Sequence, residues 1–259
     1  MNEDPKGVRL PPSIGGVIDF AYASYVERAP FYIGLALLVF AAGCIVEIAV
    51  PAAVLGTPAG ELKRAFLDFA YIFVASYVIG AVALGVGTRL AGEACSTRSL
   101  AQAAFGRWLA VIVCTLTLQL VLGLTLRLGG LGTLPEPRAL VFLTAPFVWM
   151  VWGMLSLAAP IAALSAERPA FAIFAGFGRA VSLSLRVANL PRLAIVAFIS
   201  VVPSLLQQIA FDTMVQHGVQ HVIFWADVPI DALTVGPLAA LQTAFAIDFA
   251  RRAADQRSA

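Results

Sequence analysis

The chain has 259 residues, of which 60% are hydrophobic and only 12% are charged, with a formal net charge of +2. Soluble globular domains carry about 45–50% apolar and about 25% charged residues, so this composition excludes an ordinary soluble enzyme and a disordered chain. The chain has three cysteines, which cannot all pair with one another, and this excludes a disulfide-stapled secreted domain. We therefore expect lipid to surround most of the chain.

Six stretches are long and apolar enough to cross a bilayer core of about 30 Å, which takes about 20 helical residues. They are apolar on all sides, which favours helices over barrel strands. The predicted fold is an all-α membrane domain over residues 14–250, between an N-terminal tail (1–13) and a C-terminal tail (251–259). Prolines predict kinks near Pro146, Pro160, Pro203 and Pro237. The predicted spans are Phe31–Val54, Phe69–Gly87, Trp108–Leu126, Ala139–Ala166, Leu193–Phe211 and Ile230–Ala250.

Basic residues are unevenly divided between the segments that connect these spans. Thirteen of the 17 lie before the first span, in the connections after spans two and four, and in the C-terminal tail. Basic residues concentrate on the cytoplasmic side of a membrane. We therefore expect a protein of the bacterial inner membrane with both termini in the cytoplasm. The first apolar run begins only at Phe31 and exceeds the core of a signal peptide, so we expect it to remain as a signal anchor.

Three segments predict amphipathic helices lying in the headgroup region on the cytoplasmic side: Val17–Ala29, Thr97–Phe105 and Phe171–Asn189. Ser96 or Thr97 is the expected N-cap of the second. The third carries two stripes at helical spacing. One is apolar (Phe174, Phe177, Val181, Leu185), and the other is polar (Arg179, Ser182, Arg186, Asn189).

The densest cluster of basic residues follows the fourth predicted span, and it suggests the main binding surface. Each basic residue near an anionic membrane surface contributes about 1 kcal/mol of attraction, although membrane topology alone also explains such a cluster. No H-E-x-x-H, G-x-S-x-G, P-loop or G-x-G-x-x-G sequence is present, so neither catalysis nor a cofactor nor nucleic-acid binding is expected. The leading interpretation is a non-catalytic accessory or scaffold protein that contacts lipid headgroups or a membrane partner through Arg168, Arg179, Arg186 and Arg192.

Polar residues inside the spans support an alternative. Glu47, Gln119 and Gln242 could line the path of a carrier for a small or lipid-like substrate. They are equally explained by snorkelling of Glu47 to the outer interface and by interhelical hydrogen bonds of the glutamines. A third interpretation is a subunit of a larger complex or a homo-oligomer, since the small residues in Ala75–Gly87 allow close helix approach.

Two further groups have simple structural explanations. Asp248 precedes Arg251 and Arg252 by three and four positions, which predicts a local surface pair at a helix end. His217 and His221 have the spacing of two zinc ligands on one helical face, but Gly218 weakens such a helix and no metalloprotease spacing accompanies them. A hydrated outer turn is the favoured interpretation, and no metal site is predicted.

A short pattern before the fifth span resembles a known group of bacterial membrane proteins. Ser182, Leu185 and Asn189, followed by Arg192 and Leu193, are similar to a motif of the YciC-like proteins and of the membrane domain attached to some glycerophosphodiester phosphodiesterases. Val181 stands where that group tends to have arginine. The resemblance implies a six-span fold with cytoplasmic interfacial helices. It implies no phosphodiesterase activity, because that activity belongs to a separate soluble domain.

Overall fold

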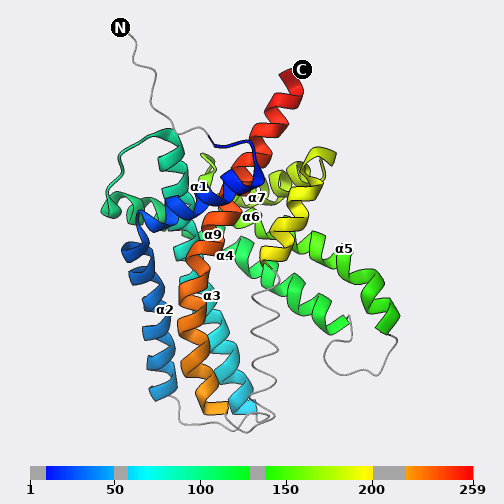
Figure 1. The fold of residues 1–259 in the computed structure, drawn as a ribbon. Helices are drawn as coiled ribbons and strands as arrows, with labels where there is room; N and C mark the ends of the chain where they lie inside the picture. The colour runs from blue at the N-terminus through cyan, green and yellow to red at the C-terminus, as the bar shows by residue number, and fades with distance from the viewer. Residues whose placement is uncertain (1–9, 50–57, 129–137, 201–219, 259) are drawn as a thin grey trace.

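The computed structural model describes the backbone of residues 10–49, 58–128, 138–200 and 220–258, with most of their side chains. All regular secondary structure in these ranges is helical, which confirms the all-α class (Figure 1). A further helical segment covers residues 190–200. The other helices are α1 (Ile14–Val26), α2 (Ala29–Ala49), α3 (Pro58–Ala91), α4 (Thr97–Leu128), α5 (Arg138–Ser156), α6 (Ala158–Leu164), α7 (Pro169–Ser184), the 3-10 turn η1 (Val187–Asn189) and α9 (Gln220–Ser258).

Four to five of the described helical segments could cross a membrane. Phe69–Ala91, Thr97–Val121, Phe147–Leu164 and Leu233–Gln256 are each long and apolar enough, and the bent pair of Pro169–Ser184 and Val187–Ser200 raises the number to five if it counts as one span. In α2, the part with described side chains, Ala29–Leu38, forms a shorter apolar helix. Residues 201–211 of the predicted fifth span lie outside the described residues.

The long helices α2, α3 and α9 run side by side, and α4 packs against α3 (Figure 1). The shared core is made largely of small side chains, among them Val78, Ala81 and Val82 of α3. In lipid no hydrophobic force draws helices together, so small residues stabilise the bundle by allowing close approach. The short helix α1 crosses and packs against α9 (Figure 1). There Tyr25 covers Gly236, where an added Cβ would come within 2.5 Å of the tyrosine ring.

The predicted span Ala139–Ala166 is two helices, interrupted at Leu157 between α5 and α6. Pro160 explains the interruption, because a proline has no N–H for the carbonyl four residues earlier and its ring clashes with that carbonyl. By contrast, α5 and α9 continue through Pro146 and Pro237 as single helices. Pro203 lies outside the described residues.

The segment Thr97–Phe105 is not a separate interfacial helix but the first turns of α4. Its predicted start is correct: the backbone N–H of Ser99 donates to Ser96 Oγ at 3.1 Å, which makes Ser96 the N-cap. Nothing in the sequence after Phe105 stops the helix, since a single glycine does not end one. The predicted interfacial helix therefore forms the N-terminal extension of the third span.

Helix α7 has two contrasting faces. Ala172, Gly176, Ala180 and Ser184 recur every four residues and are buried. They allow close contact with α6, where a Cβ on Gly176 would come within 2.8 Å of the Ala158 carbonyl oxygen. The large apolar side chains point outward instead, and Phe174 is 76% exposed. The next helix leaves α7 at an angle of 87°.

Replacing Gly176 with alanine is expected to destabilise the protein by about 1–3 kcal/mol, because the methyl group meets backbone that cannot move aside. The matched control is Gly178→Ala on the same helix, where nothing lies within 4 Å of the added Cβ. That change should be neutral or stabilising, since alanine is the better helix former. Thermal unfolding of both variants in detergent measures the difference, and equal midpoints would contradict the close α6–α7 contact.

Candidate functional site

Arginine side chains from separate segments meet at the end of the bundle where residues 10–12 contact α9. Arg28 donates to the Cys95 carbonyl at 3.4 Å, and Arg89 pairs with Glu27 at 2.9 Å. Arg107 donates to the Glu167 carbonyl, which joins the connections after spans two and four. These basic residues belong to the segments that the charge distribution assigns to one side of the membrane.

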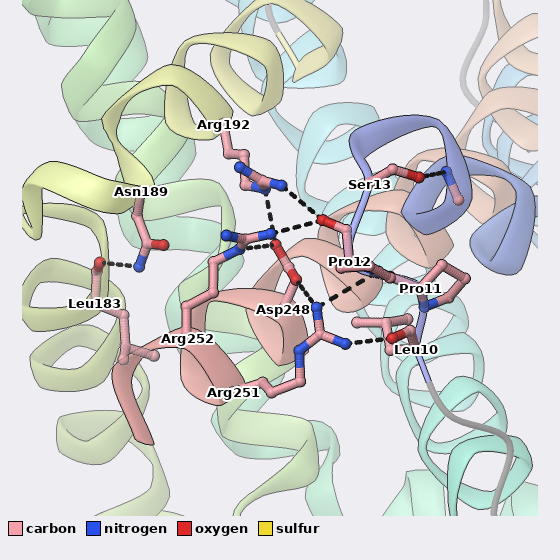
Figure 2. A network of polar contacts seen from close by, with 11 residues as sticks. Leu10, Pro11, Pro12, Ser13, Leu183, Asn189, Arg192, Asp248, Arg251 and Arg252 are labelled. Atoms are coloured by element: carbon pink, nitrogen blue, oxygen red, sulfur yellow. Dashed lines mark hydrogen bonds and ion pairs between the residues drawn. The ribbon is translucent and has the colours of Figure 1, made fainter. Parts of the chain in front are cut away.

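The centre of this end is Asp248, whose carboxylate has no solvent exposure and contacts three arginines (Figure 2). Arg251 Nη2 donates to Oδ1 at 2.8 Å, and Arg252 Nε donates to Oδ2 at 2.9 Å. The third partner is Arg192, with its Nε 2.9 Å from Oδ2, on the helical segment 190–200. A buried carboxylate needs such compensation, because losing hydration without it costs several kcal/mol.

The same arginines hold the N-terminal segment. Pro12 O accepts hydrogen bonds from Arg252 Nη2 at 2.7 Å and from Arg192 Nη2 at 2.9 Å, while Arg251 donates to the carbonyls of Leu10 and Pro11 (Figure 2). Prolines suit this position, because they offer carbonyl acceptors and have no N–H that would need a partner of its own. Directly afterwards, Ser13 Oγ accepts from the Gly16 N–H and begins α1.

The prediction of a local surface pair at Asp248 is therefore correct in its partners and wrong in its setting. The carboxylate pairs with Arg251 and Arg252, but it is buried and also joins Arg192 and the N-terminal segment. Spacing along one helix cannot reveal partners that lie 56 or 240 positions away. The only signal was the Pro-Pro-Ser sequence at 11–13, which marks a segment rich in acceptors and a helix start.

The four arginines of the predicted binding cluster do not share one site. Arg192 belongs to the Asp248 cluster, and Arg168 is the exposed N-cap residue of α7. Arg179 and Arg186 remain together, and both line a cavity of about 310 Å³ between α7 and the C-terminal part of α9. The cluster thus divides into a structural member, an exposed member and a pair facing a groove.

The turn between α7 and the next helix carries the motif that resembles the YciC-like proteins. Asn189 is buried, and its Nδ2 donates to the Leu183 carbonyl at 2.8 Å, which fixes the turn (Figure 2). Arg192 follows three positions later and reaches Asp248. These two motif residues therefore set the direction in which the chain leaves α7.

The polar residues predicted to line a carrier path have different surroundings. Gln242 is buried, and its Nε2 donates to Ser200 Oγ at 3.1 Å. The Ser200 hydroxyl in turn donates to Ser156 Oγ at 3.3 Å, next to the α5–α6 break. Gln119 is exposed on α4, and the side chain of Glu47 lies outside the described residues. The structure thus gives Gln242 a partner inside the protein and does not bring it together with Gln119.

Within the described ranges, no group of three or more His, Cys, Asp or Glu side chains has the arrangement of a metal site. The side chains of His217 and His221 fall outside these ranges. Cys95 and Cys114 are free thiols.

No protein-family model matches the chain, and no curated protein or solved structure is similar enough to be identified as a relative. The resemblance to the YciC-like proteins therefore stays a prediction that depends on the residues of the α7 turn.

Replacing Asp248 with asparagine is expected to destabilise the protein by about 3 kcal/mol. This is the lower end of the range for breaking a buried ion pair, because the three arginines keep some contact with solvent. Denaturant unfolding in detergent measures the loss, and protease cleavage near residue 10 should become faster. Asp19→Asn is the control, since it removes the same charge from an exposed position on α1. Equal stability of the two variants would contradict a structural role of the cluster.

Proposed function

We propose that this protein is a non-catalytic accessory or scaffold protein of the bacterial inner membrane. It crosses the membrane six times with both termini in the cytoplasm, and α7 lies in the cytoplasmic headgroup region. Anionic lipids contact its basic side chains, and a membrane partner would bind the same face. Four of the six spans are the four long apolar helices given above. The other two are the first, in α2, and the fifth, which includes the helical segment 190–200.

The observation that carries this proposal is the outward face of α7. Phe171, Phe174 and Leu185 are 63%, 76% and 59% exposed, although burial of each such side chain is worth about 1.5–3 kcal/mol. A helix that packs its small residues inward and presents its large apolar ones outward suits an apolar environment. Arg179 and Ser182 lie beside this face, as in helices that rest at a membrane surface.

The positions of the basic residues support the orientation. Contacts made by arginines join four parts of the chain at one end of the bundle. These parts are the N-terminal segment, the two connecting segments and α9. An excess of basic residues at one end is typical of a cytoplasmic face. The contacts between residues 10–12 and α9 also support this orientation, because they bring the two ends of the described chain together, as expected for an even number of spans.

A carrier is the second candidate, favoured by the polar chain of Gln242, Ser200 and Ser156 at a helix break. Substrate sites of transporters often lie at such interrupted helices. Each of these side chains is, however, hydrogen-bonded within the protein, which is what helix packing in lipid requires. We therefore favour the accessory role over transport.

The depth of α7 in the bilayer tests this proposal. Spin labels are placed by Phe174→Cys and Ser182→Cys in a variant that lacks the native cysteines, reconstituted into lipid nanodiscs. The label at 174 should collide more with oxygen, which dissolves in lipid, and the label at 182 more with a water-soluble nickel chelate. Equal collision with the nickel chelate at both positions would contradict an interfacial α7.

The orientation has a separate test. With Cys44 and Cys114 replaced by alanine, the native Cys95 should react with a membrane-impermeant thiol reagent only after the inside of the cell is opened. A cysteine introduced at Gln216, in a background that also lacks Cys95, should react in intact spheroplasts. Reaction of both positions from the same side would overturn the six-span topology.

A further inference from the structure

The groove between α7 and α9 combines positive charge with small neighbours. Its volume is about 310 Å³. The α7 side contributes the guanidinium groups of Arg179 and Arg186 and the hydroxyl of Ser182, while the α9 side contributes only the alanines 250, 253 and 254. The lining thus carries two positive charges and no carboxylate.

Both guanidinium groups are held at the edge of this groove. Arg186 Nη1 donates to the Ala253 carbonyl at 3.2 Å and to Gln256 Oε1 at 3.4 Å. A guanidinium group has five N–H donors, so bonds from one nitrogen leave Nε and Nη2 for a ligand. Arg179 pairs with Glu167 at 3.3 Å, and both side chains are about half exposed. Exposed pairs of this kind contribute about 1 kcal/mol or less, so an anion that contacts Arg179 and Arg186 together can displace the carboxylate.

This chemistry suits a phosphate group. Arginine forms paired hydrogen bonds with phosphate oxygens, and charge-assisted bonds are about twice as strong as neutral ones. Ligand pockets span about 300–1,000 Å³, so this groove is at the small end and fits a phosphate with a small alcohol better than a nucleotide. The exposed apolar face of α7 begins beside the groove, which places acyl chains within reach.

We infer that this groove binds the phosphate of a single anionic phospholipid headgroup. The inference rests on the proposed interfacial position of α7 and deepens it, because it names one ligand-binding site instead of a diffuse attraction between charges. Arg179 and Arg186 bind the phosphate oxygens, Ser182 donates a further hydrogen bond, and the alanines of α9 leave room for the headgroup alcohol.

The test uses the full chain, delipidated in detergent and titrated with phosphatidylglycerol under native mass spectrometry. The groove variant R179Q/R186Q should bind at least about tenfold more weakly than the unchanged protein, which corresponds to losing about 1.4 kcal/mol of binding free energy. The control variant R98Q removes one charge from an exposed position outside the groove lining and should bind normally, whereas the single-charge groove variant R179Q should bind more weakly. Equal weakening of R98Q and R179Q would overturn the inference, because general attraction would then explain the binding.

A second variant keeps the test valid if R179Q/R186Q unfolds. R179K/R186K retains both charges but loses the planar donor geometry, so it should also bind more weakly than the control. Unchanged binding by the lysine variant would contradict recognition by the guanidinium groups.

The source of the phosphate and the position of α7 are tested in separate arms. Glycerol 3-phosphate and inorganic phosphate are added as competitors. Weak competition supports a lipid headgroup, and competition at the same concentration as the lipid would overturn the lipid in favour of a soluble phosphate ester. The spin label at position 174 reports on α7 independently: loss of lipid binding with an unchanged label depth supports the groove, whereas a water-exposed label contradicts the proposed function itself.

Discussion

A carboxylate removed from water must be compensated within the protein, and Asp248 obtains this compensation from three arginines on two segments that lie far apart in the sequence. Arg251 and Arg252 come from its own helix, and Arg192 comes from the helix that follows α7. Because the same guanidinium groups also bind the carbonyls of residues 10–12, one buried charge fixes the N-terminal segment, α9 and the start of the 190–200 helix relative to one another. The groove between α7 and α9 depends on this arrangement, since Asn189 fixes the turn from α7 only three residues before Arg192.

The arginines at this end of the bundle serve two physical purposes at once. A basic residue left in a connecting segment opposes its transfer across the membrane, whatever it touches afterwards. Here the same residues also satisfy backbone carbonyls, as Arg28 does at Cys95 and Arg186 does at Ala253. The Cys95 carbonyl lies outside the helices, in the connection between α3 and α4, and so needs a partner from elsewhere. Arginine is well suited to this because its planar donors reach several acceptors while its aliphatic stem lies along apolar neighbours.

The sequence predicted those features that depend on local spacing. The apolar character of the spans, the N-cap at Ser96 and the outward stripe on α7 all follow from residues within a few turns of one another, whereas the kink predicted near Pro160 is a full break between α5 and α6. The ion pairs of Asp248 with Arg251 and Arg252 were predictable for the same reason, but Arg192 and Pro12 were not, because only the folded bundle brings them close. Local sequence also could not predict that the four arginines would occupy different surroundings. Whether each is exposed or buried depends on how α7 packs against α6. The length of α4 was underestimated because the polar residues before Trp108 continue its helix without a stop signal.

The contact between Pro12 and Arg252 also orders events during biosynthesis. The two residues are 240 positions apart, so residues 10–12 have no complete binding site until α9 has been synthesised. Until then α1 has no α9 to pack against, so the N-terminal segment cannot reach its final position while the spans insert. A product that ends before residue 248 therefore lacks the groups that hold residues 10–12, so both its N-terminal segment and its C-terminal end are open to proteases.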